Sequence, residues 1–125
     1  FWGVEERIPR GQGNFSGRES RGEVDRSIYD GYVDNHVGIA PVGSYRANRF
    51  GIYDMDGNVS EWMHNFVEVQ QRSDQFSIFG PNQGLRHLVK GGNYLSASRD
   101  DLEIRKVQAK MGKGFEIGFR LAKSI

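Results

Sequence analysis

The sequence predicts an α+β domain that is rich in loops, with short antiparallel strands and little helix. Seventeen glycines stand against three prolines, so many positions can take the positive φ angles that tight turns require. Eight Phe, five Tyr and two Trp favour a core built from rings rather than from aliphatic helix faces. No long segment shows the 3.6-residue period of an amphipathic helix. Because 125 residues suffice for one modest core, we expect a single domain over residues 1–125.

The first half of the chain carries few regular elements. Residues 1–35 are rich in Gly, Ser and Arg and show no period, so we expect irregular chain there. One short helix is indicated over residues 23–32, ending near Gly31. Residues 37–45 carry β-branched side chains interrupted by Pro41, which predicts an extended segment at a sheet edge.

The second half carries clearer strand signals. Residues 59–69 fit a strand or a short helix, and residues 70–86 form a polar connection with Gly-Pro and Asn-Gln-Gly turn signals. Residues 87–98 predict a strand that enters a Gly-Gly kink, and residues 101–110 predict a strand or a distorted helix. Residues 114–125 alternate apolar side chains on one face, which predicts a terminal strand. The alternating residues are Phe115, Ile117, Phe119 and Leu121.

Charge and composition exclude several classes of function. The formal net charge is +1 without a block of like charge, so nothing indicates nucleic-acid binding. No apolar run approaches the roughly 20 residues that a membrane span requires. The absence of cysteine excludes disulfides, thiolate nucleophiles and Cys-ligated zinc within these residues. His36, His64 and His87 lack metal-binding spacing, so we expect surface or structural roles for them. The start at Phe1 suggests a fragment or a processed chain.

The acidic stretch GIYDMDGNVSEW, residues 51–62, is the clearest candidate for a metal site. It is not an EF-hand, because counting from Asp54 places Gly57 and Glu61 too early in the loop. Ca²⁺ nevertheless takes six to eight oxygens, and main-chain carbonyls serve as well as carboxylates. A turn kinked at Gly57 can bring Asp54 and Glu61 to one ion. The alternative is an ordinary turn at Asp56 with its carboxylates in water.

The order of several motifs resembles the formylglycine-generating enzyme (sulfatase-modifying factor) family, a variant of the C-type lectin-like fold. The motifs are PVGSYRANRFGIYDMDGNVSEW at 41–62, VKGGNY at 89–94 and GFRLA at 118–122, preceded by FWG at 1–3, GNFSG at 13–17 and YDGY at 29–32. The resemblance spans nearly the whole chain. It covers only the C-terminal portion of that fold, so it implies the N-terminal half of the fold as a partner of this chain.

The resemblance implies two structural calcium ions. The first is held by an Asn side chain, the next carbonyl, an Asp and the carbonyl two residues later, which correspond here to Asn14, Phe15, Asp30 and Tyr32. The second is held by a side chain before the Gly-Asn turn, two carbonyls and a Glu, which correspond to Asp54, Gly57, Val59 and Glu61. All of these groups supply the hard oxygen ligands that Ca²⁺ prefers.

The oxidase chemistry of the family is not implied for this chain. The two copper-binding cysteines of the oxidases correspond to Ser96 and Asp101, and a soft Cu(I) ion does not select a hydroxyl and a carboxylate. The family's usual Ser and Trp near the pocket are Asn93 and Ser60 here. The related sulfoxide synthases hold iron on a separate helical domain, which has no counterpart in these residues.

Three functional hypotheses follow from these residues. The first is a non-catalytic, calcium-stabilised module that binds a ligand or protein or forms part of an envelope or secreted assembly, which would favour an extracytoplasmic location. Its candidate ligand-binding residues are Asn93, Ser96, Ser98 and Arg99, for which the alternative is a solvated loop. The second is the C-terminal substrate-binding part of a metal-dependent oxidase whose ligands lie elsewhere. The third is a displayed recognition protein that varies between Gly92 and the terminal GFR motif. Arg120 of that motif is expected to form a structural ion pair.

Overall fold

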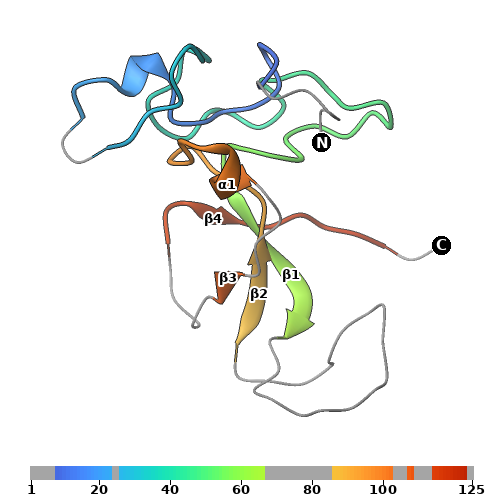
Figure 1. Ribbon diagram of the computed structural model, residues 1–125. Coiled ribbons are helices and arrows are strands. Elements are labelled where there is room, and N and C mark those ends of the chain that lie inside the picture. The colour runs from blue at the N-terminus through green and yellow to red at the C-terminus, as the bar shows by residue number, and fades with distance from the viewer. Residues whose placement is uncertain (1–7, 24–25, 67–85, 103–106, 109–113, 124–125) are drawn as a thin grey trace.

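The computed structural model consists of a loop-rich layer and a small sheet (Figure 1). Residues 8–23 and 26–58, coloured blue to green, form the loop-rich layer, and the strands extend away from it. Nowhere in the described residues is a helix long and apolar enough to cross a bilayer. The structure describes residues 8–23, 26–66, 86–102, 107–108 and 114–123.

The sheet has four short strands in the order β3-β2-β1-β4. Strand β1 is Ser60–Phe66, β2 is His87–Lys90, β3 is Val107–Gln108 and β4 is Ile117–Gly118. β2 pairs antiparallel with β1 and with β3, whereas β4 runs parallel to β1. The expected loop-rich α+β class is therefore confirmed, but the sheet is mixed rather than wholly antiparallel.

The central pair of strands follows the sequence prediction. Residues 60–66 are a strand, which decides between the two alternatives for that segment, and β2 ends in a kink where Gly91 takes a φ of +89°. Trp62 lies opposite the buried Val89, and the register shifts between Trp62 and Phe66. The prediction for residues 67–69 and for the connection up to residue 85 lies outside the described residues.

Residues 101–110, which were predicted to form a strand or a distorted helix, contain the end of a short helix and a short strand. A single helical turn, α1 at Arg99–Leu102, is followed by the two-residue strand β3. The Asp101 carboxylate accepts hydrogen bonds from the backbone N–H groups of Ala97 and Ser98 at 3.1 and 3.0 Å. Ser98 and Asp101 therefore close this turn through side-chain bonds to the backbone.

The terminal strand is much shorter than predicted. Only Ile117 and Gly118 pair with β1, and residues 119–123 are irregular. A Cβ atom at Gly118 would lie 2.7 Å from the Val59 side chain, so the close approach to the start of β1 depends on this glycine. The alternating apolar side chains stay exposed, at 89%, 75% and 88% for Phe115, Phe119 and Leu121.

The short helix predicted over residues 23–32 is wrong for residues 26–32, which are not helical, whereas residues 24–25 lie outside the described residues. A 3₁₀ turn, η1 at Arg18–Ser20, lies earlier in the chain. The backbone of Tyr29 instead donates to the Ser16 carbonyl at 2.6 Å, and the Arg26 guanidinium donates to the Val37 carbonyl at 2.6 Å. Bonds to distant segments replace the local bonds of a helix.

The extended segment predicted over residues 37–45 forms no strand. Both backbone groups of Ala40 bond to the side chain of Asn58, with N–H···Oδ1 at 2.8 Å and Nδ2–H···O at 3.1 Å. The side-chain amide thus takes the place of a neighbouring strand. This arrangement ties the segment to the acidic turn.

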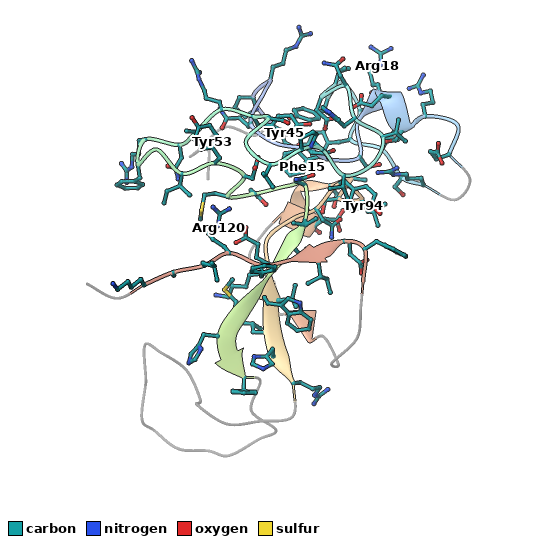
Figure 2. All side chains as sticks on the ribbon, turned by 180° about the vertical axis from the view of Figure 1, so that it is seen from behind. Phe15, Arg18, Tyr45, Tyr53, Tyr94 and Arg120 are labelled. Atoms are coloured by element: carbon teal, nitrogen blue, oxygen red, sulfur yellow. The ribbon has the colours of Figure 1, made fainter. Side chains whose placement is uncertain are left out.

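The core of the loop-rich layer is small and aromatic, as predicted. Ile8, Phe15 and Tyr32 are buried together with Tyr29 packed against them, and the rings of Phe15 and Tyr32 meet edge to face at 5.6 Å. Figure 2 shows Phe15 and Tyr45 inside this layer and Arg120 where the layer meets the sheet. This core holds the acidic turn and the segment around residue 14 together.

Candidate functional site

Five side-chain oxygens of the described chain are buried without a hydrogen-bond partner. One is the Ser20 hydroxyl, and the other four are the acceptors Asn14 Oδ1, Glu19 Oε2, Asp54 Oδ1 and Asp56 Oδ2. Amide and carboxylate oxygens only accept hydrogen bonds, and leaving such a group buried and unpaired costs about 1–3 kcal/mol. A bound cation would satisfy the same oxygens.

Asn14 lies at the centre of the first group. The side chain is fully buried, and its Nδ2 donates to the Gly38 carbonyl at 2.7 Å and to Asn58 Oδ1 at 3.1 Å. Both donors are thus used while Oδ1 is left without a partner. An amide that is fixed by its nitrogen presents its oxygen in one direction, as a metal ligand must.

Two carboxyl groups lie beside the next residue. The backbone N–H of Phe15 donates to Asp34 Oδ2 at 2.7 Å, and the backbone N–H of Asp34 donates to Glu19 Oε1 at 2.9 Å. Burial, and then a side-chain hydrogen bond with Glu19, raise the pKa of Asp34 to about 7. The pair therefore takes up a proton readily, and a divalent cation would neutralise it in the same way.

The structure does not bring all four residues predicted for the first site together. Asp30 is exposed, with 88% of its side chain accessible, and pairs weakly with Arg21 at 3.8 Å. The carbonyls of Phe15 and Tyr32 lie in the buried core but accept hydrogen bonds from the N–H groups of Gly17 and Arg18, both at 2.8 Å. Asp34, which the sequence analysis did not select, occupies the position next to Phe15.

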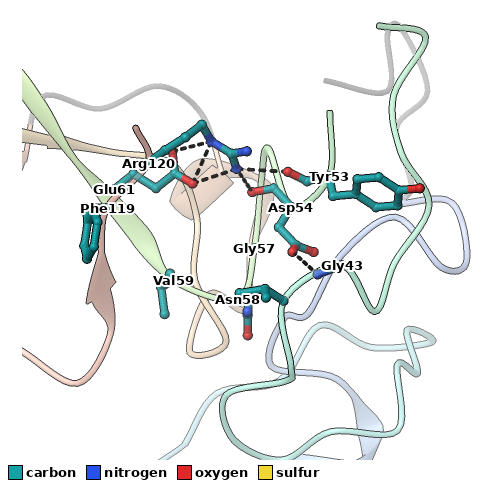
Figure 3. Close-up of a pocket in the computed structure, with 10 residues that line it drawn as sticks. Gly43, Tyr53, Asp54, Gly57, Asn58, Val59, Glu61, Phe119 and Arg120 are labelled. Atoms are coloured by element: carbon teal, nitrogen blue, oxygen red, sulfur yellow. Dashed lines mark hydrogen bonds and ion pairs between the residues drawn. The ribbon is translucent and has the colours of Figure 1, made fainter. Parts of the chain in front are cut away.

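All four residues predicted for the second site line one cavity of about 370 Å³ (Figure 3). Asp54 takes a φ of +50°, and its Oδ2 accepts from the Gly43 N–H at 2.6 Å while Oδ1 has no donor. Gly57 follows with a φ of +81°. The remaining lining residues are Val42, Gly43, Tyr53, Asn58, Val59, Glu61, Phe119 and Arg120. The spacing of the acidic turn therefore brings these four residues to one cavity.

Glu61 is already paired within this cavity. Arg120 Nη2 lies 2.7 Å from Glu61 Oε1, and Arg120 Nε lies 3.1 Å from both carboxylate oxygens. The side chains of Arg120 and Glu61 are 35% and 19% exposed. The expected ion pair of Arg120 is thus confirmed, and its partner is a predicted calcium ligand.

Asp56 supports the turn from the other side. Its Oδ1 accepts from the backbone N–H groups of Gly57 at 3.1 Å and Gly92 at 2.8 Å, which joins the acidic turn to the Gly-Gly kink. Burial raises the pKa of Asp56, although these two hydrogen bonds act in the opposite direction. Its second oxygen is the fourth unpaired acceptor.

Three of the four residues predicted to bind a ligand make hydrogen bonds within the protein, namely Asn93, Ser96 and Ser98. Asn93 Nδ2 donates to Ser60 Oγ at 3.1 Å, and the backbone N–H of Asn93 donates to the buried Ser96 Oγ at 3.0 Å. Ser98 Oγ donates to Asp101 at 2.8 Å, and Arg99 begins α1. The structure brings these residues into one turn, and their role in ligand binding stays a prediction.

Sequence reasoning missed three residues that organise these sites. Glu19 and Asp34 were passed over because nothing in their immediate sequence distinguishes them from exposed carboxylates. Asp34 precedes Asn35, which has a φ of +71°, so an Asp-Asn pair forms the same kind of turn as an Asp-Gly pair. Asn58 was read as part of a turn, although its side chain links Ala40 and Asn14.

No group of three His, Cys, Asp or Glu side chains suited to a metal occurs in the described parts of the chain. A cation site here must therefore draw on amide and main-chain oxygens in addition to carboxylates. This is the ligand mixture that Ca²⁺ accepts and that Zn²⁺ or copper does not prefer.

Comparison with known proteins agrees with this architecture. Among curated relatives, the kinase "Serine/threonine-protein kinase pkn1" of Chlamydia caviae is 36% identical over 110 residues, covering 82% of this chain and 17% of that protein. The formylglycine-generating enzyme of Streptomyces coelicolor is 30% identical over 95 residues, covering 71% of this chain and 30% of the enzyme. The chain therefore spans less than a third of either relative.

A solved structure shows the same fold. "Treponema denticola variable protein 1" superposes with a TM-score of 0.50 at 21% identity, covering 94% of this chain and 42% of that one. The model of the family described as "Sulfatase-modifying factor enzyme 1-like domain" matches residues 8–125. Membership of this family accounts for the sequence motifs, the loop-rich layer and the small mixed sheet. This chain belongs to the sulfatase-modifying factor enzyme 1-like family.

Proposed function

We propose that this chain is a non-catalytic, calcium-stabilised binding module of the formylglycine-generating enzyme type. The observation that carries the proposal is the excess of buried acceptor oxygens at Asn14, Glu19, Asp54 and Asp56. A domain that buries acceptors without donors is best stabilised by a hard cation. Because free calcium is abundant outside the cytoplasm, the proposal includes an extracytoplasmic location.

The positions that correspond to the oxidase cysteines support a non-catalytic role. Ser96 is buried and accepts a hydrogen bond from the backbone of Asn93, and Asp101 caps the turn at α1. The full sequence contains no cysteine, so this chain supplies no thiolate for copper. Both positions serve structure here.

At the first site, we propose Asp34 in place of Asp30. Asn14 Oδ1 and Glu19 Oε2 are unpaired, and Asp34 is buried between Phe15 and Glu19. The second site keeps the predicted set of Asp54 with the residues around Gly57 and Glu61. Both sites then join segments distant in sequence, so calcium would stabilise the loop-rich layer.

Removing calcium is expected to lower the melting temperature. An ion that binds only the folded state stabilises it by about 2.7 kcal/mol when its free concentration is 100 times the Kd. We would measure melting by calorimetry in excess calcium and in excess chelator, together with ion stoichiometry by native mass spectrometry. Equal melting temperatures without any bound ion would reject the calcium proposal.

Two matched variants test the first site. Asp34→Asn is expected to remove part of the difference between calcium and chelator, whereas Asp30→Asn should leave that difference unchanged because Asp30 is exposed. If Asp30→Asn reduced the difference and Asp34→Asn did not, Asp30 and not Asp34 would be the ligand, as the family resemblance implies. Each variant changes one carboxyl group to an amide, so the comparison holds the size of the side chain constant.

The binding face that we propose lies along the C-terminal segment. Phe119 and Leu121 are exposed, and Phe119 also lines the cavity. β4 is an edge strand with one neighbour among the described strands. The chain aligns over 94% of its length with a solved structure of the same fold but covers only 42% of that structure. We therefore propose that the rest of the family's fold is the partner that covers this face.

A photo-reactive benzoylphenylalanine at Phe119 tests this partner. In the full polypeptide that carries this domain, we expect cross-links to a segment outside these 125 residues, identified by peptide mass spectrometry. The same probe at Glu23, an exposed position in the loop-rich layer, should not reach that segment. Cross-links from Phe119 only to a second copy, only to an unrelated protein, or to nothing would contradict the proposed partner.

A further inference from the structure

Arg120 makes more contacts than an ion pair with Glu61 requires. Its Nη2 also donates to the main-chain carbonyls of Tyr53 and Asp54, both at 2.9 Å (Figure 3). One guanidinium thus collects a carboxylate and two carbonyls from the acidic turn. Carboxylate and main-chain carbonyl oxygens are also the ligands that Ca²⁺ binds.

We propose that Arg120 is a built-in cation of the second site, which holds the Glu61 side of the turn without metal and competes with Ca²⁺ for that carboxylate. This inference rests on the proposed calcium function. In this proposal Arg120 lowers the affinity of the site for calcium but does not coordinate the ion. The remaining half of the site, around Asp54 Oδ1, stays available to an ion.

The electrostatics of the cavity support competition. The planar guanidinium of Arg120 matches the two oxygens of a carboxylate. With Asp54 and Glu61 ionised, the cavity holds two negative charges and one positive charge. An ion that shared Glu61 would lie close to the guanidinium and would be repelled by it. Arg120 therefore stabilises the metal-free turn and weakens calcium binding.

The arrangement also makes the two sites unequal. At the first site, no cation from the described residues contacts the unpaired oxygens of Asn14 and Glu19. At the second site, one of the two carboxylates is already neutralised. We therefore expect the first site to account for most of the calcium dependence of the wild-type protein.

The deciding experiment compares Arg120→Gln with the wild type. Glutamine keeps hydrogen-bonding capacity but removes the charge. In chelator, the variant should melt several degrees below the wild type, and calcium should restore most of the loss. Calorimetric titration should show calcium binding tightened at least about tenfold at the second site. That gain should vanish in the double variant Arg120→Gln/Glu61→Gln.

Two controls isolate the charge at this position. Arg120→Lys keeps the charge and should retain calcium affinity close to that of the wild type. Arg10→Gln removes an exposed arginine elsewhere and should change neither melting nor affinity. Unchanged or weaker calcium binding in Arg120→Gln would overturn the inference while leaving the calcium proposal intact.

The other outcomes are equally decisive. Failure of Arg120→Gln to fold in calcium would contradict the claim that an ion can replace the guanidinium. If neither the wild type nor the variant binds calcium, the inference and the proposed function fall together. If the wild type binds one ion and the variant binds two, competition by Arg120 is supported in its strongest form.

Discussion

Replacing Gly57 with alanine is expected to destabilise the protein by about 4 kcal/mol, from backbone strain of about 1–2 kcal/mol and overpacking of about 1–3 kcal/mol. Gly57 has a φ of +81°, which L-residues rarely adopt. A Cβ there would lie 2.7 Å from the Asn14 carbonyl oxygen and 2.9 Å from the Phe15 ring. Because the nearest obstacle is backbone, it cannot rotate away.

Gly31 offers a matched control for this prediction. It has the same φ of +81°, but no atom lies within 4 Å of the Cβ that alanine would add. Gly31→Ala should therefore cost only the backbone strain, about 1–2 kcal/mol. Chemical denaturation of both variants separates strain from crowding. Equal losses at the two positions would show that the contact between Gly57 and Asn14 is not tight in solution.

The close approach at Gly57 matters for more than stability. The backbone N–H of Asn58 donates to the same Asn14 carbonyl at 2.7 Å, so displacing that carbonyl also breaks a buried hydrogen bond. Asn14 and the acidic turn belong to different proposed calcium sites. The contact therefore fixes the two sites relative to each other, and Gly57→Ala should lower calcium affinity at both.

The sequence predicted those features that depend on neighbouring residues. The residues around the Gly-Gly pair predicted β2 and its kink at Gly91, whereas the segment of β1 fitted either a strand or a short helix. The acidic turn around Gly57 was recognised because its acceptors and its glycine lie within eight residues of chain. Local conformation there decides which groups share the cavity.

The carboxylate that we propose for the first site could not be predicted from neighbouring residues. Asp30 precedes Gly31 and Asp34 precedes Asn35, and both following residues take positive φ angles of 81° and 71°. The local signals are equivalent. The difference arises from burial, because Asp34 accepts from the Phe15 N–H, 19 residues away, while Asp30 points to solvent. Such a contact is a property of the whole fold.

The C-terminal segment shows the limit of alternation as a strand signal. Its pattern of Phe115, Phe119 and Leu121 fits a strand, but a strand also needs a neighbour that can approach closely. Among the described residues, pairing occurs only at Ile117 and Gly118, where glycine leaves room for Val59. The exposed apolar side chains after Gly118, Phe119 and Leu121, fit the proposal that the rest of the family's fold covers this face.

Replacing Asn58 with alanine is expected to cost about 3–5 kcal/mol, because it leaves several buried polar groups without partners at about 1–3 kcal/mol each. The side chain of Asn58 is buried and satisfies both the N–H and the C=O of Ala40, at 2.8 and 3.1 Å. Its Oδ1 also accepts from Asn14 Nδ2 at 3.1 Å. Water cannot reach these groups to replace the lost bonds.

Asn48 is the matched control, because its Oδ1 also accepts two backbone N–H bonds, from Phe50 at 2.9 Å and Ile52 at 3.1 Å, but in an exposed turn. Solvent can replace these bonds, so Asn48→Ala should cost about 1 kcal/mol or less. Urea denaturation of the two variants would test the difference. Since Asn58 also fixes Asn14, its loss should abolish chelator sensitivity at the first site, whereas Asn48→Ala should retain it. Similar losses of stability in the two variants would mean that Asn58 does not link the extended segment, the acidic turn and the Asn14 site into one cooperative unit.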